Sequence, residues 1–132
     1  TVLLQFILEM WKKGFVTEND TSGRNTVEKE MVSYIQQNFT GTISLKEFGE
    51  QFHLSEKYIS RYFKEHFHIT ISQYVTYLRL KHAKQLLQDT DIPVTEIAMQ
   101  SGYQNISYFI RSFKKTYEVS PLQYRKNKLT EI

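Results

Sequence analysis

Apolar residues recur every three to four positions along most of this chain, a spacing that places them on one face of an α-helix. The pattern predicts helices over residues 1–13, 27–39 and 71–88. Residues 17–26 are polar and contain a glycine, so we expect them to form a linker. Because the alternating pattern of a β-strand is weak throughout, we predict an all-α fold.

Capping residues divide the remaining sequence into shorter helices. Segments 44–47, 70–73 and 120–123 each place Ser or Thr three residues before Glu or Gln, the spacing of a capping box. Ser55 and Asn105 can each cap a further helix through a side-chain oxygen. The short helices that we expect are therefore about 45–51, 56–66, 94–101, 106–117 and 121–128.

Two pairs of these short helices are each joined by a short turn, which is the helix-turn-helix arrangement. The first pair covers about residues 44–66 and the second about 94–117. The long helix over 71–88 would link the pairs, and a final helix would cover about 121–128. Together with the helix before them, these elements give about seven helices, preceded by the helical segment 1–16.

Part of the chain is repeated. Residues 55–74 match residues 105–124 without a gap, and 45–49 match 94–98 if one residue is inserted near Gln104. Such a repeat indicates a supersecondary unit that is used twice. The identical positions are Tyr58, Arg61, Phe63, Lys64, Gln73 and Tyr74, which match Tyr108, Arg111, Phe113, Lys114, Gln123 and Tyr124.

The repeated side chains are of two kinds. Aromatic residues at helical spacing are typical of a core, and we prefer this to the alternative that they stack on unpaired bases. A core does not need the repeated arginine and lysine on the helix surface, so we infer a partner outside the chain that is contacted twice. The aromatic residues concerned are Tyr58, Tyr62, Phe63, Tyr108, Phe109 and Phe113.

The distribution of charge supports an anionic partner. The chain has 132 residues and a net charge of +3, which by itself implies little. Residues 1–104 are close to neutral, whereas residues 105–128 carry six Lys or Arg side chains against Glu118 alone. A basic C-terminal quarter suits an anionic partner, although a solvated basic tail would have the same composition.

Several classes of site find no support in the sequence. The chain has no cysteine, which excludes disulfides and thiolate ligands and fits a reducing cytoplasm. The histidines at 53, 66, 68 and 82 form no metal-binding pair at i, i+4 on one helix, and no nucleophile elbow or phosphate loop occurs. The apolar run within residues 2–11 is too short to span a bilayer and lacks signal-peptide features. We therefore expect no enzyme, metal, cofactor or membrane partner.

At this point the chain resembles the DNA-binding domain of the AraC/XylS family of bacterial transcription regulators. The resemblance covers about residues 27–126, and the domain would extend over 27–128. The matching segments are Ile97-Ala98, Gly102-Tyr103, Ser107-Tyr108-Phe109, Arg111, Phe113-Lys114-Lys115, Ser120-Pro121 and Tyr124-Arg125, with Arg79-Leu80, Ala83 and Leu86-Leu87 in the linker helix.

The resemblance implies a cytoplasmic, non-enzymatic regulator that binds double-stranded DNA sequence-specifically and has RNA polymerase as a possible partner. A chain that starts at Thr1 suggests a fragment, and residues 1–16 would be the remnant of a sensing and dimerisation domain. The alternatives are that this segment packs back on the domain or that it is disordered. A rival function is a protein-interaction module that keeps the fold without binding DNA.

The resemblance also implies a set of DNA-contacting residues. Lys64, Lys114 and Lys115 lie one turn beyond the base-reading positions and suit phosphate, as do Arg125 and Lys126 at the start of a helix. The implied base-reading residues are Lys57, Ser60, Arg61, Ile106, Ser107, Ile110 and Arg111. The two isoleucines would contact thymine methyl groups, or would pack against a neighbouring helix.

Two further features concern geometry. His68 and Glu118 stand where the family usually has glycine in a left-handed cap. If the backbone is kept, each of them lowers the stability of the fold by about 1 kcal/mol. Ile110 stands where the family often has serine, which removes a polar reader. A linker helix of about 18 residues would span about 27 Å and let the two units reach successive major-groove segments.

Overall fold

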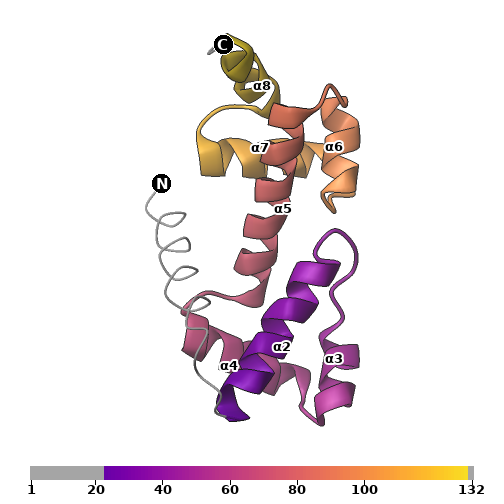
Figure 1. The fold of residues 1–132 in the computed structure, drawn as a ribbon, viewed down its shortest axis with the longest axis vertical. Helices are drawn as coiled ribbons and strands as arrows, with labels where there is room; N and C mark the ends of the chain where they lie inside the picture. Colours follow the sequence, from indigo (N-terminus) through magenta and orange to yellow (C-terminus); the bar gives the residue numbers. More distant parts are fainter. Residues whose placement is uncertain (1–22, 131–132) are drawn as a thin grey trace. The chain divides into compact units, whose positions relative to one another are not determined.

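A computed structural model describes the backbone of residues 23–130. This part of the chain is all-α with seven helices, as expected (Figure 1). None of these helices is long and apolar enough to cross a membrane. Their bounds are α2 Gly23–Asn38, α3 Leu45–Phe52, α4 Glu56–Phe67, α5 Ile71–Asp89, α6 Val94–Gln100, α7 Ile106–Tyr117 and α8 Pro121–Thr130.

Most helix boundaries lie within two residues of the predicted ones, and the exception is the start of α2. This helix begins at Gly23, so the last four residues of the expected linker are helical. The expected helical segment 1–16 lies outside the described residues. The chain divides within α5, between Thr76 and Tyr77, into two compact units. We call them the N-terminal unit and the C-terminal unit.

The N-terminal unit contains α2, α3, α4 and the start of α5. Tyr34 of α2 joins this helix to the start of α3, because its hydroxyl donates to the Ser44 carbonyl (3.2 Å) and accepts from the Ser44 N–H (3.0 Å). Gln36 of α2 donates to the Tyr74 hydroxyl of α5 at 3.2 Å. These bonds surround a buried apolar core that includes Met31, Ile35, Phe48, Ile59, Phe63, Phe67 and Tyr74.

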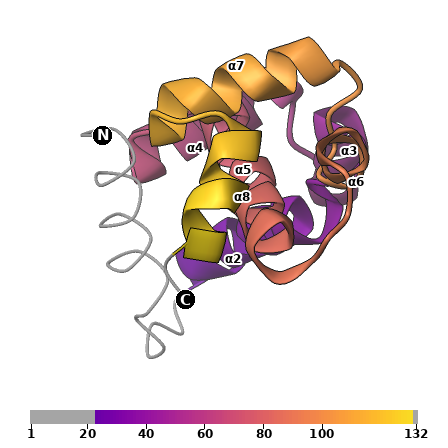
Figure 2. The same cartoon turned by 90° about the horizontal axis from the view of Figure 1, so that it is seen from above.

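The C-terminal unit contains the rest of α5 with α6, α7 and α8. Figure 2 shows α7 and α8 as neighbouring helices of this unit. Tyr124 of α8 packs against the core, with its ring centroid 5.8 Å from that of Phe113. The core cluster consists of Leu80, Ala83, Leu87, Ile97, Ala98, Tyr103, Phe109 and Phe113.

The predicted capping boxes are present to different extents. At the start of α5 the box is reciprocal, since the Gln73 N–H donates to Thr70 Oγ1 (3.0 Å) and the Thr70 N–H donates to Gln73 Oε1 (2.9 Å). At the start of α8 the Ser120 hydroxyl accepts from the Gln123 N–H at 3.1 Å, but the Gln123 amide donates to Asn127. Ser44 likewise accepts from the Glu47 N–H, so all three helices begin where the caps predict.

The turn inside each helix-turn-helix unit is closed by one equivalent backbone bond. The Leu54 N–H donates to the Gly49 carbonyl at 2.8 Å, and the Tyr103 N–H donates to the Ala98 carbonyl at 2.9 Å. In the first turn the Leu54 carbonyl lies so close to Gly49 that a Cβ there would clash with it. The second turn is longer, contains Gly102 at φ 103°, and has Ala98 at the position that matches Gly49.

Candidate nucleic-acid interface

The second helices of the two units, α4 and α7, have the same frame. Ser55 opens α4 by accepting from the Tyr58 N–H (3.1 Å), and Asn105 opens α7 by accepting from the Tyr108 N–H (2.9 Å). Each helix has 12 residues and ends at a left-handed residue. Equivalent residues of the repeat therefore occupy equivalent positions on the two helices.

The left-handed caps are the predicted ones. His68 has φ 61° and Glu118 has φ 69°, although neither is glycine. Their N–H groups donate to the carbonyls of Lys64 (2.9 Å) and Lys114 (2.7 Å), which closes each helix. His68 and Glu118 thus keep the left-handed cap that glycine would form. They therefore give no support to the rival function, a protein-interaction module that does not bind DNA.

Each helix presents one buried and one exposed face. Ile59 and Phe63 of α4 are buried, as are Phe109 and Phe113 of α7. At 100° per residue the opposite face carries positions 57, 58, 61 and 65 of α4 and 107, 108, 111 and 115 of α7. The predicted base-reading side chains Lys57, Ser60, Arg61, Ser107, Ile110 and Arg111 are exposed.

The two isoleucines of α7 have different environments. Ile106 is half-buried and packs against the core cluster of the C-terminal unit. Ile110 is 37% exposed and does not belong to that cluster. The packing alternative therefore accounts for Ile106, whereas Ile110 keeps an apolar surface that suits a thymine methyl group.

The core interpretation of the aromatic residues is wrong for two of them. Tyr58 is 40% exposed and Tyr108 is 52% exposed, whereas Phe63, Phe109 and Phe113 are fully buried as expected. Tyr58 and Tyr108 each lie one position before a buried residue and so point about 100° away from it on the helix. Two tyrosines thus lie beside the predicted base-reading side chains.

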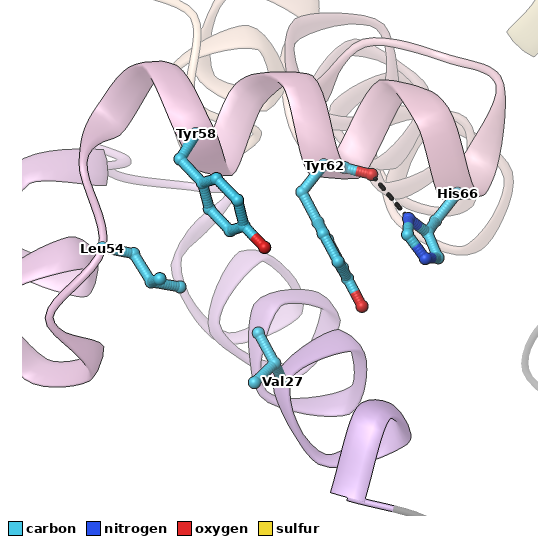
Figure 3. Close-up of a pocket in the computed structure, with 5 residues that line it drawn as sticks. All are labelled: Val27, Leu54, Tyr58, Tyr62 and His66. Atoms are coloured by element: carbon cyan, nitrogen blue, oxygen red, sulfur yellow. Dashed lines mark hydrogen bonds between the residues drawn. The ribbon is translucent and has the colours of Figure 1, made fainter.

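A stacked row of aromatic rings joins α4 to α2 (Figure 3). Tyr62 stacks on Tyr58 with centroids 5.8 Å apart and on His66 with centroids 3.9 Å apart. The Tyr62 hydroxyl donates to Glu28 Oε1 of α2 at 3.1 Å, and His66 Nε2 lies 3.4 Å from the same oxygen. With Val27 and Leu54 these rings line an open hollow. The repeat places Ser112 and Thr116 at the positions of Tyr62 and His66, so the row belongs to the N-terminal unit.

The predicted phosphate-binding residues fall into two groups. Lys64, Lys114, Lys115 and Lys126 are exposed, and the Lys64 ammonium lies 3.5 Å from the His68 carbonyl. Arg125 differs, because its guanidinium is half-buried and donates to two carbonyls at the end of α5. Its Nε lies 3.2 Å from Leu87 O and its Nη2 lies 3.0 Å from Thr90 O. These bonds give Arg125 a role in closing α5, and its expected contact with phosphate stays a prediction.

The two arginines of the repeat also differ in their neighbours. Arg61 Nε lies 4.0 Å from Glu65 Oε1, and its guanidinium carbon lies 5.8 Å from the centroid of the Tyr58 ring. For Arg111 no such ion pair or ring contact occurs within the described residues. Glu65, which the sequence analysis did not single out, is replaced by Lys115 at the matching position of α7.

Behind α7, Tyr103 supports the exposed Tyr108. The ring centroids of these tyrosines are 6.1 Å apart, and the Arg79 guanidinium lies over the Tyr103 ring at 5.8 Å. Burial raises the pKa of Tyr103 to about 12, although the positive charge of Arg79 acts in the opposite direction. The phenol therefore stays neutral and acts as a packing surface in the turn.

Comparison with known proteins identifies this arrangement. A family described as helix-turn-helix domain matches residues 48–127, from α3 to α8. The chain belongs to the AraC/XylS family of helix-turn-helix regulators. The matched residues include both turns, both exposed helices and the whole of α5.

Two relatives illustrate the family. The melibiose operon regulatory protein of Escherichia coli K12 is 29% identical over 95% of this chain and 44% of its own length. The transcriptional activator RhaS of Mannheimia succiniciproducens is 35% identical over 81% of this chain and 41% of its own length. The chain thus spans less than half of these curated relatives.

A solved structure extends the likeness to the fold. The C-terminal domain of the two-component response regulator yesN from Fusobacterium nucleatum is 35% identical, with a TM-score of 0.70. The match covers 76% of this chain and 98% of that domain. Domains of this size and fold therefore occur at the C-terminal end of larger regulators.

Proposed function

We propose that this chain is the DNA-binding part of a bacterial transcription regulator, and that α4 and α7 each enter a major groove. The observation that carries the proposal is the repeated frame of these helices, which exposes Arg61 and Arg111 at equivalent places opposite a buried face. A major groove admits one α-helix and presents base edges to its exposed side chains. Arginine suits this task because its fork can bond O6 and N7 of guanine together.

Two sets of side chains divide the work in this proposal. The lysines in the last turns of α4 and α7, together with Lys126 of α8, neutralise phosphates. Arg125 holds α8 against the end of α5 and thereby positions Lys126. Ile106 is left out of the reading set because it packs inward. The proposed base-reading residues are Lys57, Ser60, Arg61, Ser107, Ile110 and Arg111, and the proposed phosphate-binding residues are Lys64, Lys114, Lys115 and Lys126.

The continuous helix α5 supports a two-part binding site on DNA. It has 19 residues and contains the boundary between the two units. A helix of this length measures about 28 Å, which is close to one turn of B-DNA at about 34 Å. We therefore expect half-sites about 10 base pairs apart, in successive major-groove segments on one side of the duplex.

The likeness to regulators of more than twice this length suggests the wider context. In the whole protein we propose a cytoplasmic, non-enzymatic regulator that acts on transcription by RNA polymerase. A homodimer held by the segment before the DNA-binding domain would fit the expected helical residues 1–16.

Selection of bound sites from random duplexes tests the proposal. We expect one recovered motif with two parts, and an affinity for duplex DNA that falls as salt rises. Lys114→Ala should weaken selected and random duplexes alike and should reduce the salt slope by about one unit. Lys29→Ala, an exposed lysine of α2, is the control and should change neither. Salt-independent binding, or no enriched motif, would argue for the protein-interaction alternative.

A further inference from the structure

The exposed face of α4 differs from that of α7 at one charged position. On α4 the line opposite the core carries Tyr58, Arg61 and Glu65, at i, i+3 and i+7. On α7 the repeat places Tyr108, Arg111 and Lys115 along the same line. The tyrosine and the arginine are kept, whereas the acid is exchanged for a base.

Glu65 is placed to act on both Arg61 and DNA. Its carboxylate lies 4.0 Å from Arg61 Nε, and the two side chains are 64% and 65% exposed. A pair so exposed adds little to the stability of the folded chain. The guanidinium carbon of Arg61 also lies over the Tyr58 ring, 5.8 Å from its centroid. Arg61 thus has two neighbours on the helix surface that can restrain its side chain.

We propose that Glu65 is a specificity-determining residue of the first recognition helix, which restrains Arg61 and opposes the approach of α4 to phosphates. This inference rests on the proposed function. On a duplex without the matching guanine, the repulsion between Glu65 and the phosphates is not offset. On the matching site the bidentate bond from Arg61 to guanine offsets it. Discrimination by α4 therefore depends on Glu65 as well as on Arg61.

The second recognition helix then supplies general affinity. Arg111, Lys114 and Lys115 are exposed on α7, and no acidic residue occurs in that helix. Each neutralised phosphate releases counterions whatever the base sequence. The two helices would thus contribute differently. The helix α7 adds affinity for any duplex to its own base contacts, whereas Glu65 makes the binding of α4 depend on its matching guanine.

Glu65→Gln is the direct test, measured on the selected duplex and on random duplexes across a range of salt. Removing the negative charge should tighten binding to random duplexes about three- to eightfold and steepen the salt slope by up to about one unit. The selected duplex should gain less, so the ratio of the two affinities should fall about threefold. Glu65→Lys should exaggerate both effects. Lys115→Gln is the matched control and should weaken both duplexes without changing the ratio.

A double-mutant cycle with Arg61→Ala separates a positioning role from simple charge repulsion. In the Arg61→Ala background, Glu65→Gln should still tighten random duplexes but should no longer change the ratio. Equal melting temperatures would exclude loss of folding, as expected for exposed side chains. If the wild-type chain binds salt-dependently and Glu65→Gln leaves the ratio unchanged, the role of Glu65 is overturned while the proposed function stands. If the wild type binds no duplex, both fail.

Discussion

The two helix-turn-helix units share a frame and differ on their surface. Both second helices are opened by a polar side chain and closed by a left-handed non-glycine residue, and they share two buried apolar positions, to which α4 adds Phe67. Their other positions diverge, because α4 carries the exposed Glu56 and Glu65 where α7 carries the half-buried Ile106 and the exposed Lys115. The comparison teaches that cap and core positions set the frame, and that the remaining positions are available for different tasks.

The turns differ in the way they avoid a clash. In the N-terminal unit the turn is short, and Gly49 inside α3 makes room for the Leu54 carbonyl. In the C-terminal unit the matching residue is Ala98, and the glycine lies in the longer turn at Gly102. Both turns contain a residue with positive φ, His53 at 58° and Gly102 at 103°, so they differ in the close backbone approach at Gly49.

The largest expected effect comes from separating the units. Lys81→Pro removes one N–H from α5 and places the proline ring against the Tyr77 carbonyl, which costs about 3 kcal/mol or more. Because the helix is then broken near the boundary between the units, simultaneous binding of both half-sites should be lost. Gel-shift titration on single and double half-sites measures this, and each unit can then be compared by itself.

Lys81→Ala is the control, because alanine keeps the helix. Inserting five base pairs between the half-sites should reproduce the defect in the wild-type chain, since it rotates one half-site by about half a turn. Undiminished affinity for the lengthened site would mean that the units are flexibly tethered or that only one of them binds.

The turns give the second prediction. Gly49→Ala forces the Leu54 carbonyl to move and should lower the free energy of unfolding by about 1–3 kcal/mol. Ala98→Gly, at the matching position, should lower it by only about 1 kcal/mol through helix propensity and a small lost contact. Chemical denaturation compares the two. Equal losses in the free energy of unfolding would show that the close backbone approach at Gly49 does not make the first turn more sensitive than the second.

Local features of the sequence were sufficient to predict the frame. A capping box such as Thr70–Gln73 acts within four residues. The left-handed backbone at His68 and Glu118 was expected from the family resemblance, since neither residue is glycine. Exposure was harder to predict, since the amphipathic pattern alone assigned Tyr58 and Tyr108 to the core. Their exposure depends on which flank of the helix the neighbouring helices cover.

Non-local contacts could not be predicted at all. The acceptors of Arg125 lie 35 and 38 residues away at the end of α5, so nothing near Arg125 in the sequence indicates them. The row of rings from Tyr58 to His66 likewise depends on Glu28, which is 34 residues before Tyr62. Such contacts require the tertiary arrangement of each unit.

Arg125 provides the third prediction, which concerns stability in the C-terminal unit. Arg125→Ala leaves two carbonyls at the end of α5 without their charged donor and should lower the free energy of unfolding by about 1.5–3 kcal/mol. Lys126→Ala, the exposed neighbour, should leave the melting temperature unchanged and weaken random duplexes. If Arg125→Ala melts normally and only loses affinity for DNA, the arginine belongs with the phosphate-binding residues instead.

The repeated arginines provide the fourth prediction. Arg61→Ala and Arg111→Ala should each weaken the selected site by about 1–3 kcal/mol and relax the preference for one guanine. Arg111→Ala should also weaken random duplexes, whereas Arg61→Ala should do so less because Glu65 already opposes phosphate there. Competition with random DNA separates these effects. A mutant that melts much lower but keeps its site preference would identify that arginine as structural.

The smallest expected effect compares the two left-handed caps. Glu118→Gly and His68→Gly should each raise the free energy of unfolding by up to about 1 kcal/mol, because glycine adopts φ near 60–70° without the clash of a Cβ. Glu118→Ala and His68→Ala are the controls and should give no gain, since alanine keeps the Cβ. Thermal denaturation should detect a gain of this size as a shift of about 4–8 °C. The two angles are nearly equal, so the gains should be too. A gain at one cap alone would mean that the repeated frame is under unequal strain in the two units.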